Sequence, residues 1–210
     1  MTALRELSLD QFTEALASAA ATPGGGSASA LSGALAASLL AMVARNTATN
    51  ASFADRAAEL EEIAAEADRL REELVALVDE DAAAFERVMA AFRLPKETPE
   101  LKEARSRAIQ AGYKAAAEPP LLVCRHALGV LTLAGRAAEL GNPNAVSDVG
   151  VAALLAASAL DGAALNVEIN LGSIKDETFR AESASAAQSA RSDGAKLRAK
   201  ALATVQEVLR

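Results

Sequence analysis

Apolar residues recur at helical spacing along most of the chain, and short polar or glycine- and proline-containing segments interrupt them. The longest uninterrupted pattern runs from Phe53 to Phe92 and contains neither Pro nor Gly. Its apolar stripe consists of Leu60, Leu70, Leu74, Val78, Phe85, Val88 and Phe92. A single helix of this length would extend roughly 60 Å at 1.5 Å per residue. Such a helix favours an elongated bundle or a dimer.

Capping residues and breaks divide the rest of the chain into further helices. Ser8 and Gln11 have the spacing of a capping box, Ser27 or Ser29 would cap the next helix, and Ser147 would cap a later one. The proline pair at 119–120 is expected to end one helix and start another. The breaks that the pattern predicts are residues 23–26, 46–52, 94–99, 119–120, 141–144 and 171–173. The last helix is expected from about residue 176 to the end.

The composition supports an all-α fold. Hydrophobic residues make up 51% of the chain but aromatic residues only 3%, and there is no Trp. Alanine supplies most of the apolar fraction, and it combines the best helix propensity with a minimal side chain. No segment has the pattern of a strand. We therefore expect residues 1–210 to form one all-helical domain, an elongated bundle with one long helix.

Charge and cysteine content narrow the function classes. The net charge is −7 and there is no Lys/Arg run, which argues against a nucleic-acid partner. Cys124 is the single cysteine, so an internal disulfide is excluded and a cytoplasmic location is expected. The first ten residues do not resemble a signal peptide. Residues 28–44 carry no charge but are only weakly hydrophobic, which predicts a buried helix and no membrane partner.

Asp81 lies in the register of the apolar stripe of the long helix. The stripe steps through Leu74, Val78, position 81, Phe85 and Val88 with gaps of four and three. A carboxylate in a buried register is costly unless it is paired, hydrogen-bonded or facing a cavity. The alternative is a slightly rotated helix that leaves residues 79–81 as a solvated acidic patch. The pattern alone leaves both open.

A second polar group stands at the start of an otherwise apolar helix. Asn142 and Asn144 lie in the break before it, and Ser147 and Asp148 lie in its first turn. Ordinary capping would account for Ser and Asp at a helix start. Because the helix that follows is apolar on nearly all sides, its first turn would also meet the interior of the bundle. There, these side chains could face a cleft.

The glycine run at positions 24–26 admits several interpretations. A flexible linker, a nucleotide loop and a membrane anchor all contain such stretches. A Walker loop would need Lys after the glycines, and a dinucleotide fingerprint would need a preceding strand; neither is present. A glycine turn at a helix start leaves free N–H groups that favour an anion. The small residues that follow would let neighbouring helices approach closely.

Three segments together resemble the cyclodeaminase/cyclohydrolase family. They are "PGGGSASALSGALAASLLAMVA", "DEDAAAFERVMAAFRLPKET" and "GNPNAVSDVGVAALLAASALDGAALNVEINLGSIKDETF", and they cover the chain from Pro23 to Phe179 in the family's order. The family includes the cyclodeaminase domain of formimidoyltransferase-cyclodeaminase and stand-alone bacterial methenyltetrahydrofolate cyclohydrolases. The resemblance implies an all-helical homodimer, a tetrahydrofolate substrate and no metal or other cofactor.

The resemblance also implies roles for the polar groups. Asp81 and Asp148 would be catalytic and would face the same cleft as the glycine turn, one stabilising a cationic one-carbon centre and the other moving a proton. The residues implied to bind the substrate are Gly24, Gly25, Gly26, Ser27, Asn142, Asn144 and Ser147. The missing transferase domain favours hydrolysis of 5,10-methenyltetrahydrofolate over deamination of the formimidoyl compound.

One segment departs from the family's pattern. Residues 45–52 contain one base where the family often has a lysine-rich stretch, and Arg45, Arg93, Lys96 and Lys175 are candidate substitutes. Two further hypotheses stay open, the first of them because of this departure. One is a folate-binding relative without catalysis, and the other is a structural helical dimer in which Asp81 pairs across an interface.

Overall fold

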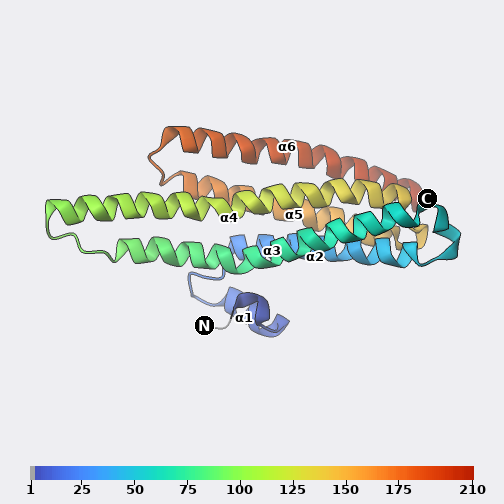
Figure 1. Cartoon of the computed structure of the whole chain (residues 1–210), viewed down its shortest axis with the longest axis horizontal. Coiled ribbons are helices and arrows are strands. Elements are labelled where there is room, and N and C mark those ends of the chain that lie inside the picture. The colour runs from blue at the N-terminus through green and yellow to red at the C-terminus, as the bar shows by residue number, and fades with distance from the viewer. Residues whose placement is uncertain (1–2) are drawn as a thin grey trace.

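The structure is a bundle of long α-helices (Figure 1). It is a computed structural model, and it describes residues 3–210. The helices are α1 (Leu9–Ala17), α2 (Gly25–Ala48), α3 (Ala57–Phe92), α4 (Pro99–Leu140), α5 (Val146–Leu171) and α6 (Glu177–Val208). Three short 3-10 helices are η1 (Leu4–Glu6), η2 (Ala51–Arg56) and η3 (Pro143–Ala145). The described residues contain no strand, so the all-α prediction is confirmed.

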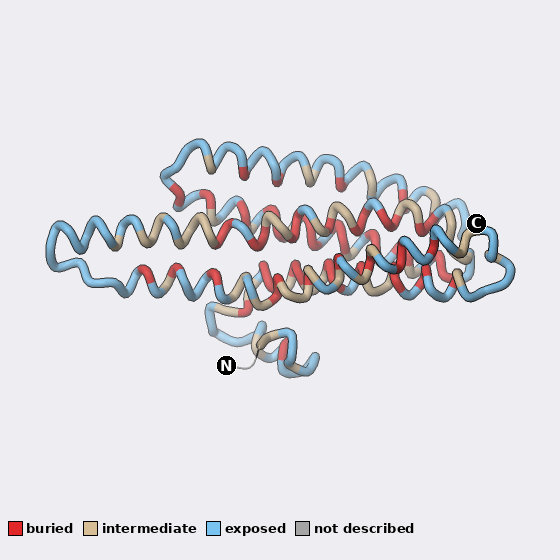
Figure 2. Tube along the Cα trace, viewed as in Figure 1, coloured by how far each residue is buried: buried red, intermediate tan, exposed pale blue. Residues whose placement is uncertain are grey.

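Antiparallel packing of α2 on α5 forms the centre of the bundle. The Ser32 hydroxyl donates to the Leu155 carbonyl at 3.0 Å, and Gly33 faces Ala159. Most buried residues of both helices are Ala, Gly or Ser, which allows close approach of the two backbones. Helices α3 and α4 pack against this pair and α6 covers α4 and α5. The buried positions run along the inside of all these helices (Figure 2).

The connection between α3 and α4 forms a hairpin that projects past the ends of α5 and α6 (Figure 1). The far part of this hairpin is mostly exposed (Figure 2). At its base, the apolar residues of α3 and α4 come close to the start of α2 and the end of α5. This corner holds the candidate site.

The predicted cap at the first helix is confirmed, whereas the caps at the second and fifth helices are wrong. Ser8 and Gln11 form the capping box. Helix α2 begins earlier than expected, with Gly24 as its N-cap, because Ser27 is buried and donates to α3 instead. Ser147 lies inside the first turn of α5, and Ala145 occupies the N-cap position.

The predicted break at the proline pair is also wrong. Helix α4 continues through Pro119 and Pro120 and is 42 residues long, about 63 Å. The longest helix is therefore α4, whereas α3 has 36 residues and follows η2. Proline removes the N–H that a helix uses to bond the carbonyl four residues earlier. Both prolines are buried, so packing holds the helix together across this gap, and a side chain of α5 replaces one missing donor.

Helix α2 is largely buried, as expected from its uncharged stretch. By length and composition, Gly25–Ala48, Pro99–Leu140 and Pro143–Leu171 could each cross a membrane. In the bundle, half or more of the most apolar window in each is buried inside the protein. The apolar side chains of these three helices are therefore in large part buried inside the bundle.

Two helix-interior glycines predict opposite effects of the same substitution. A Cβ at Gly194 of α6 would overlap with the Leu160 side chain, whereas a Cβ at Gly135 of α4 would meet nothing within 4 Å. Gly135→Ala should raise the free energy of unfolding by about 0.5–1 kcal/mol. Gly194→Ala should lower it by about 1 kcal/mol because Leu160 must move in a filled core. Urea denaturation measures both, and equal stabilisation by both would contradict the packing.

Candidate active site

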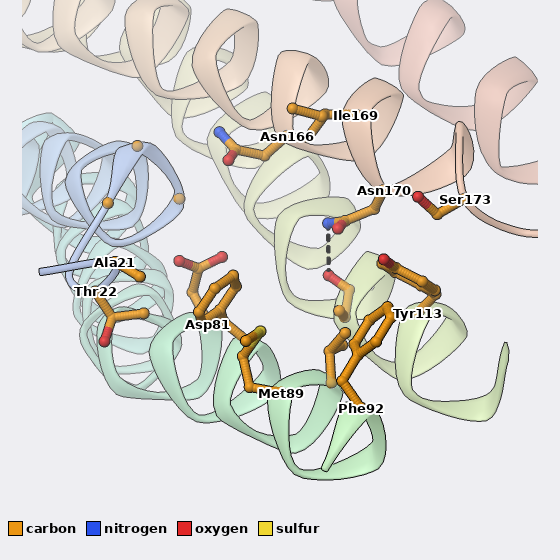
Figure 3. Close-up of a pocket in the computed structure, with 16 residues that line it drawn as sticks. Ala21, Thr22, Asp81, Met89, Phe92, Tyr113, Asn166, Ile169, Asn170 and Ser173 are labelled. Atoms are coloured by element: carbon orange, nitrogen blue, oxygen red, sulfur yellow. Dashed lines mark hydrogen bonds between the residues drawn. The ribbon is translucent and has the colours of Figure 1, made fainter. Parts of the chain in front are cut away.

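A cavity of 390 Å³ lies where α2 begins and α5 ends, against the base of the α3–α4 hairpin (Figure 3). Its lining combines apolar side chains, half of them aromatic, with several polar groups. The apolar side chains are Phe85, Val88, Met89, Phe92, Tyr113 and Ile169. The polar groups come from Gly24, Gly25, Gly26, Asp81, Asn166, Asn170 and Ser173. Such a combination of an apolar body with a few converging polar groups is typical of a small-molecule site.

Asp81 sits directly against the first turn of α2. A Cβ at Gly26 would overlap with the Asp81 carboxylate, so only glycine permits this approach. Ser27 reinforces it, because its hydroxyl donates to the Val78 carbonyl at 2.8 Å and lies 3.4 Å from Asp81 Oδ2. The glycine run therefore brings α2 and α3 close enough for a carboxylate to touch a helix N-terminus.

Burial raises the pKa of the Asp81 carboxyl, and hydrogen bonds from the Ser27 backbone N–H and hydroxyl oppose the shift. A carboxyl with a raised pKa exchanges protons closer to neutral pH than an exposed one. The N-terminus of α2 favours negative charge at the same point. The arrangement suits a group that holds and releases a proton.

The three consecutive acidic residues of α3, at positions 79–81, lie in different environments. Asp79 accepts a hydrogen bond from the Leu4 backbone N–H at 2.5 Å and pairs with Arg5 at 3.3 Å. Glu80 is exposed, and Asp81 faces the cavity. Of the two alternatives that the pattern left open, the inward-facing register is the one observed.

The second group of predicted residues lies at the opposite end of α2 and α5. The Asn142 backbone N–H donates to Thr47 Oγ1 at 3.0 Å, and Thr47 is in the last turn of α2. The 21 positions from Gly26 to Thr47 span about 32 Å of helix. The expectation that Asp81 and Asp148 share a cleft within one chain is therefore wrong. Antiparallel packing of α2 on α5 is the cause.

The residues at the other end of this helix pair, around positions 142–148, form hydrogen bonds of their own. The Asn142 side chain accepts from the Asn144 backbone N–H at 3.0 Å and caps η3. Asn142 also borders a separate cavity of 240 Å³. Ser147 is exposed in the first turn of α5, and Asp148 beside it is half-buried. The predicted substrate-binding residues thus form two groups, Gly24–Ser27 beside Asp81 and Asn142, Asn144 and Ser147 beside Asp148.

Sequence reasoning missed several residues that line the cavity. Asn166 and Asn170 stand one turn apart on the largely apolar α5, and Tyr113 is the chain's single tyrosine. Two amides at positions i and i+4 of a buried helix are a usable signal, because a buried polar group needs a partner or a ligand. Tyr113 packs edge-on against Phe92, with ring centroids 6.2 Å apart.

Cations near the cavity come from α4. Arg105 donates to the Phe92 carbonyl at 3.0 Å and lies 5.4 Å over the Phe92 ring. Lys114 bonds Asp176 at 2.6 Å.

Of the candidate substitutes for the lysine-rich stretch, Lys175 lies two residues beyond Ser173 of the cavity. Arg45 lies at the other end of α2 and pairs with Asp68.

The fold and the cavity define a helical-bundle protein with a small-molecule site built around one half-buried carboxyl. Residues 8–189 match the formiminotransferase-cyclodeaminase family, and the chain belongs to this family. It is 41% identical over 174 residues to a methenyltetrahydrofolate cyclohydrolase of Methylorubrum extorquens, covering 83% of this chain and 84% of that protein.

Other relatives carry the cyclodeaminase name. The chain is 36% identical to formimidoyltransferase-cyclodeaminase of Gallus gallus over 83% of its length, which spans 32% of that longer protein. The crystal structure of formiminotetrahydrofolate cyclodeaminase from Thermotoga maritima superposes with a TM-score of 0.89 at 29% identity. It covers 99% of this chain and 100% of that chain.

The buried carboxyl predicts a pH-dependent effect on stability. Because the pKa of Asp81 is raised in the folded state, folding is most favourable when this group is protonated, and that contribution is lost as the pH rises through the folded pKa. Asp81→Asn should therefore be more stable than wild type at pH 7. The difference should vanish near about pH 3, where both unfolded and folded carboxyls are neutral. Urea denaturation at the two pH values tests this, and a variant that is less stable at pH 7 would contradict it.

Proposed function

We propose that the protein hydrolyses 5,10-methenyltetrahydrofolate to 10-formyltetrahydrofolate. The main support is the position of Asp81. Its carboxyl lies in a cavity of 390 Å³ against the N-terminus of α2, and burial raises the pKa of this carboxyl. The 41% identity to a methenyltetrahydrofolate cyclohydrolase, over most of both chains, supports this choice.

The reaction needs few groups from the protein. The substrate carries a positive charge spread over N5, the one-carbon unit and N10. Water adds to the carbon and loses a proton, which gives a neutral tetrahedral adduct. The bond from the carbon to N5 then breaks, N5 takes up a proton and the hydroxyl of the adduct loses one, so the carbon becomes the formyl group on N10. In sum, the cation and water give 10-formyltetrahydrofolate and one proton.

A carboxylate beside this carbon can perform two tasks. Ionised, it stabilises the cation and accepts the proton of the attacking water; protonated, it delivers that proton to N5. We assign Asp81 to the reacting centre together with Asp148, one stabilising the cation and the other moving the proton. The Gly24–Ser27 turn, with the free N–H groups of Gly24–Gly26, would bind the carboxylates or the polar edge of the folate.

An exposed apolar face points to a homodimer. Leu35 and Met42 of α2 and Val151 and Leu154 of α5 are all exposed on the outside of the central pair. We call these four residues the α2–α5 face. No charged residue occurs at positions 28–44 or 149–160, so the face lies on a long uncharged surface. A second copy of this chain matches its character, because a two-fold interface brings the same surface together with itself.

The separation of the two predicted groups selects one orientation of the second copy. With a two-fold axis perpendicular to α2 and α5, the start of α2 in one subunit meets the end of α2 in the other. Asp148 of the partner subunit would then approach Asp81, and Asn142, Asn144 and Ser147 would act beside it. With an axis parallel to the helices, like ends would meet and the two groups would stay about 30 Å apart.

Cyclodeamination is the second candidate. A protein of the same fold and full length, from Thermotoga maritima, is named a formiminotetrahydrofolate cyclodeaminase. In that reaction N10 attacks the formimidoyl carbon on N5, and ammonia leaves. The same carboxyl would supply the proton for ammonia, so assaying both substrates side by side distinguishes the two activities.

Removal of either carboxylate should abolish turnover without unfolding the protein. Asp81→Asn and Asp148→Asn should each slow the decay of methenyltetrahydrofolate absorbance at least about 100-fold. Asp79→Asn is the matched control, because Asp79 lies on the same helix but bonds Leu4 and Arg5 outside the cavity. Full activity in both catalytic variants would contradict the assignment.

The wild-type assay also tests the two non-catalytic hypotheses. Folate binding without absorbance decay would identify a binding protein that has lost catalysis. Absence of binding would identify a structural helical bundle.

Mixing the two inactive variants tests the shared site. After unfolding and refolding together, Asp81→Asn and Asp148→Asn chains form mixed dimers, each with one site that retains both aspartates. About a quarter of the wild-type activity should return. A mixture that stays inactive, although sedimentation shows dimers, would contradict a site shared between subunits.

A further inference from the structure

The proline pair in α4 frees a carbonyl beside the cavity. In a regular helix the N–H of residue 120 would bond the Ala116 carbonyl, but Pro120 has no N–H. Asn170 of α5 supplies the missing donor, with its Nδ2 bonded to the Ala116 carbonyl at 3.0 Å (Figure 3). This contact joins α4 to α5 at the cavity wall.

The contact also determines which end of the Asn170 amide faces the cavity. A carbonyl can only accept, so the NH2 group must point to Ala116 and Oδ1 must point away from it. Asn170 lines the cavity, and its Oδ1 accepts no hydrogen bond from any residue between 3 and 210. A free acceptor is therefore directed at whatever fills the cavity.

Asn166, one turn earlier, repeats the arrangement. One N–H of its Nδ2 donates to the Gly162 carbonyl of its own helix at 2.8 Å, and Oδ1 accepts no hydrogen bond from the described residues. The polar side chains of α5 thus offer two acceptors. Backbone donors of the cavity lie at Gly24–Gly26 on α2, and a Cβ at Gly25 would lie only 3.4 Å from Asn166 Nδ2.

We propose that Asn170, oriented through the gap that Pro120 leaves in α4, binds an N–H donor on the ring portion of the substrate. The proposal rests on the proposed function, because it names the part of the folate that this wall recognises. A reduced pterin carries N–H donors at its amino group and ring nitrogens, and its flat body fits against Tyr113 and Phe92. Pro120 is then a positioning residue that acts only through Asn170.

Four variants test the proposal. Pro120→Ala gives the Ala116 carbonyl an intrahelical donor that competes with the Asn170 amide and weakens its orientation, while Pro119→Ala is the matched control, because its new N–H would bond Ala115 instead. Loss of one oriented hydrogen bond should raise KM for methenyltetrahydrofolate about 3- to 10-fold in Pro120→Ala and in Asn170→Leu, with kcat within about twofold. The double variant should be no worse than Asn170→Leu alone. Pro119→Ala should keep the wild-type KM.

The amide itself provides a readout that needs no substrate. In NMR spectra, the Asn170 NH2 protons, assigned by their loss in Asn170→Leu, should exchange with solvent more slowly in wild type and Pro119→Ala than in Pro120→Ala. Equal exchange in all three would overturn the role of Pro120. Equal KM values in all variants would overturn the role of Asn170 and leave the proposed function intact. A wild-type chain without turnover would overturn the proposed function instead, and the exchange comparison would still decide whether Pro120 orients the amide.

Discussion

The close approach of Asp81 to the first turn of α2 is the contact on which the rest of the site depends. It requires glycine at position 26, because any side chain there would occupy the place of the carboxylate. It sets the register of α2 against α3 through Ser27, and it partly removes a titratable group from water. The cavity exists because α2 begins at this point and α5 ends beside it. Glycine at position 26 therefore determines both the packing of α2 on α3 and the protonation behaviour of the site.

The antiparallel packing of α2 on α5 has the next largest consequence. It places the two polar groups of the predicted site at opposite ends of the central pair, with Asp81 at one end and Asp148 at the other. The same two helices expose an uncharged, apolar face between these ends. A second copy packed on that face with its helices running in the opposite direction would bring the two polar groups together. Catalysis would then depend on dimer formation.

Much of the fold could be predicted from local sequence, whereas the site could be predicted only in part. Helical spacing and breaks predicted the all-α class and most helix limits, but the apolar register left two orientations of Asp81 open, and only the packing of α2 on α3 shows that it faces the cavity. Proline rules failed at Pro119 and Pro120, because burial and the amide of Asn170 compensate for the missing donors. The distance between Asp81 and Asp148 could not be read from sequence, since it depends on helix direction. The orientation of the Asn166 and Asn170 amides could not be predicted from sequence either, because it depends on the carbonyls to which they donate.

The central claim is that the folate reacts at Asp81, between the start of α2 and the two amides of α5. A crystal structure of Asp81→Asn grown with methenyltetrahydrofolate tests it most directly, because the slowed variant should retain the substrate. We expect the one-carbon unit within hydrogen-bonding reach of residue 81, with the pterin against Tyr113 and its N–H groups at Asn170. A folate bound at another cavity, with residue 81 free of contact, would contradict the account.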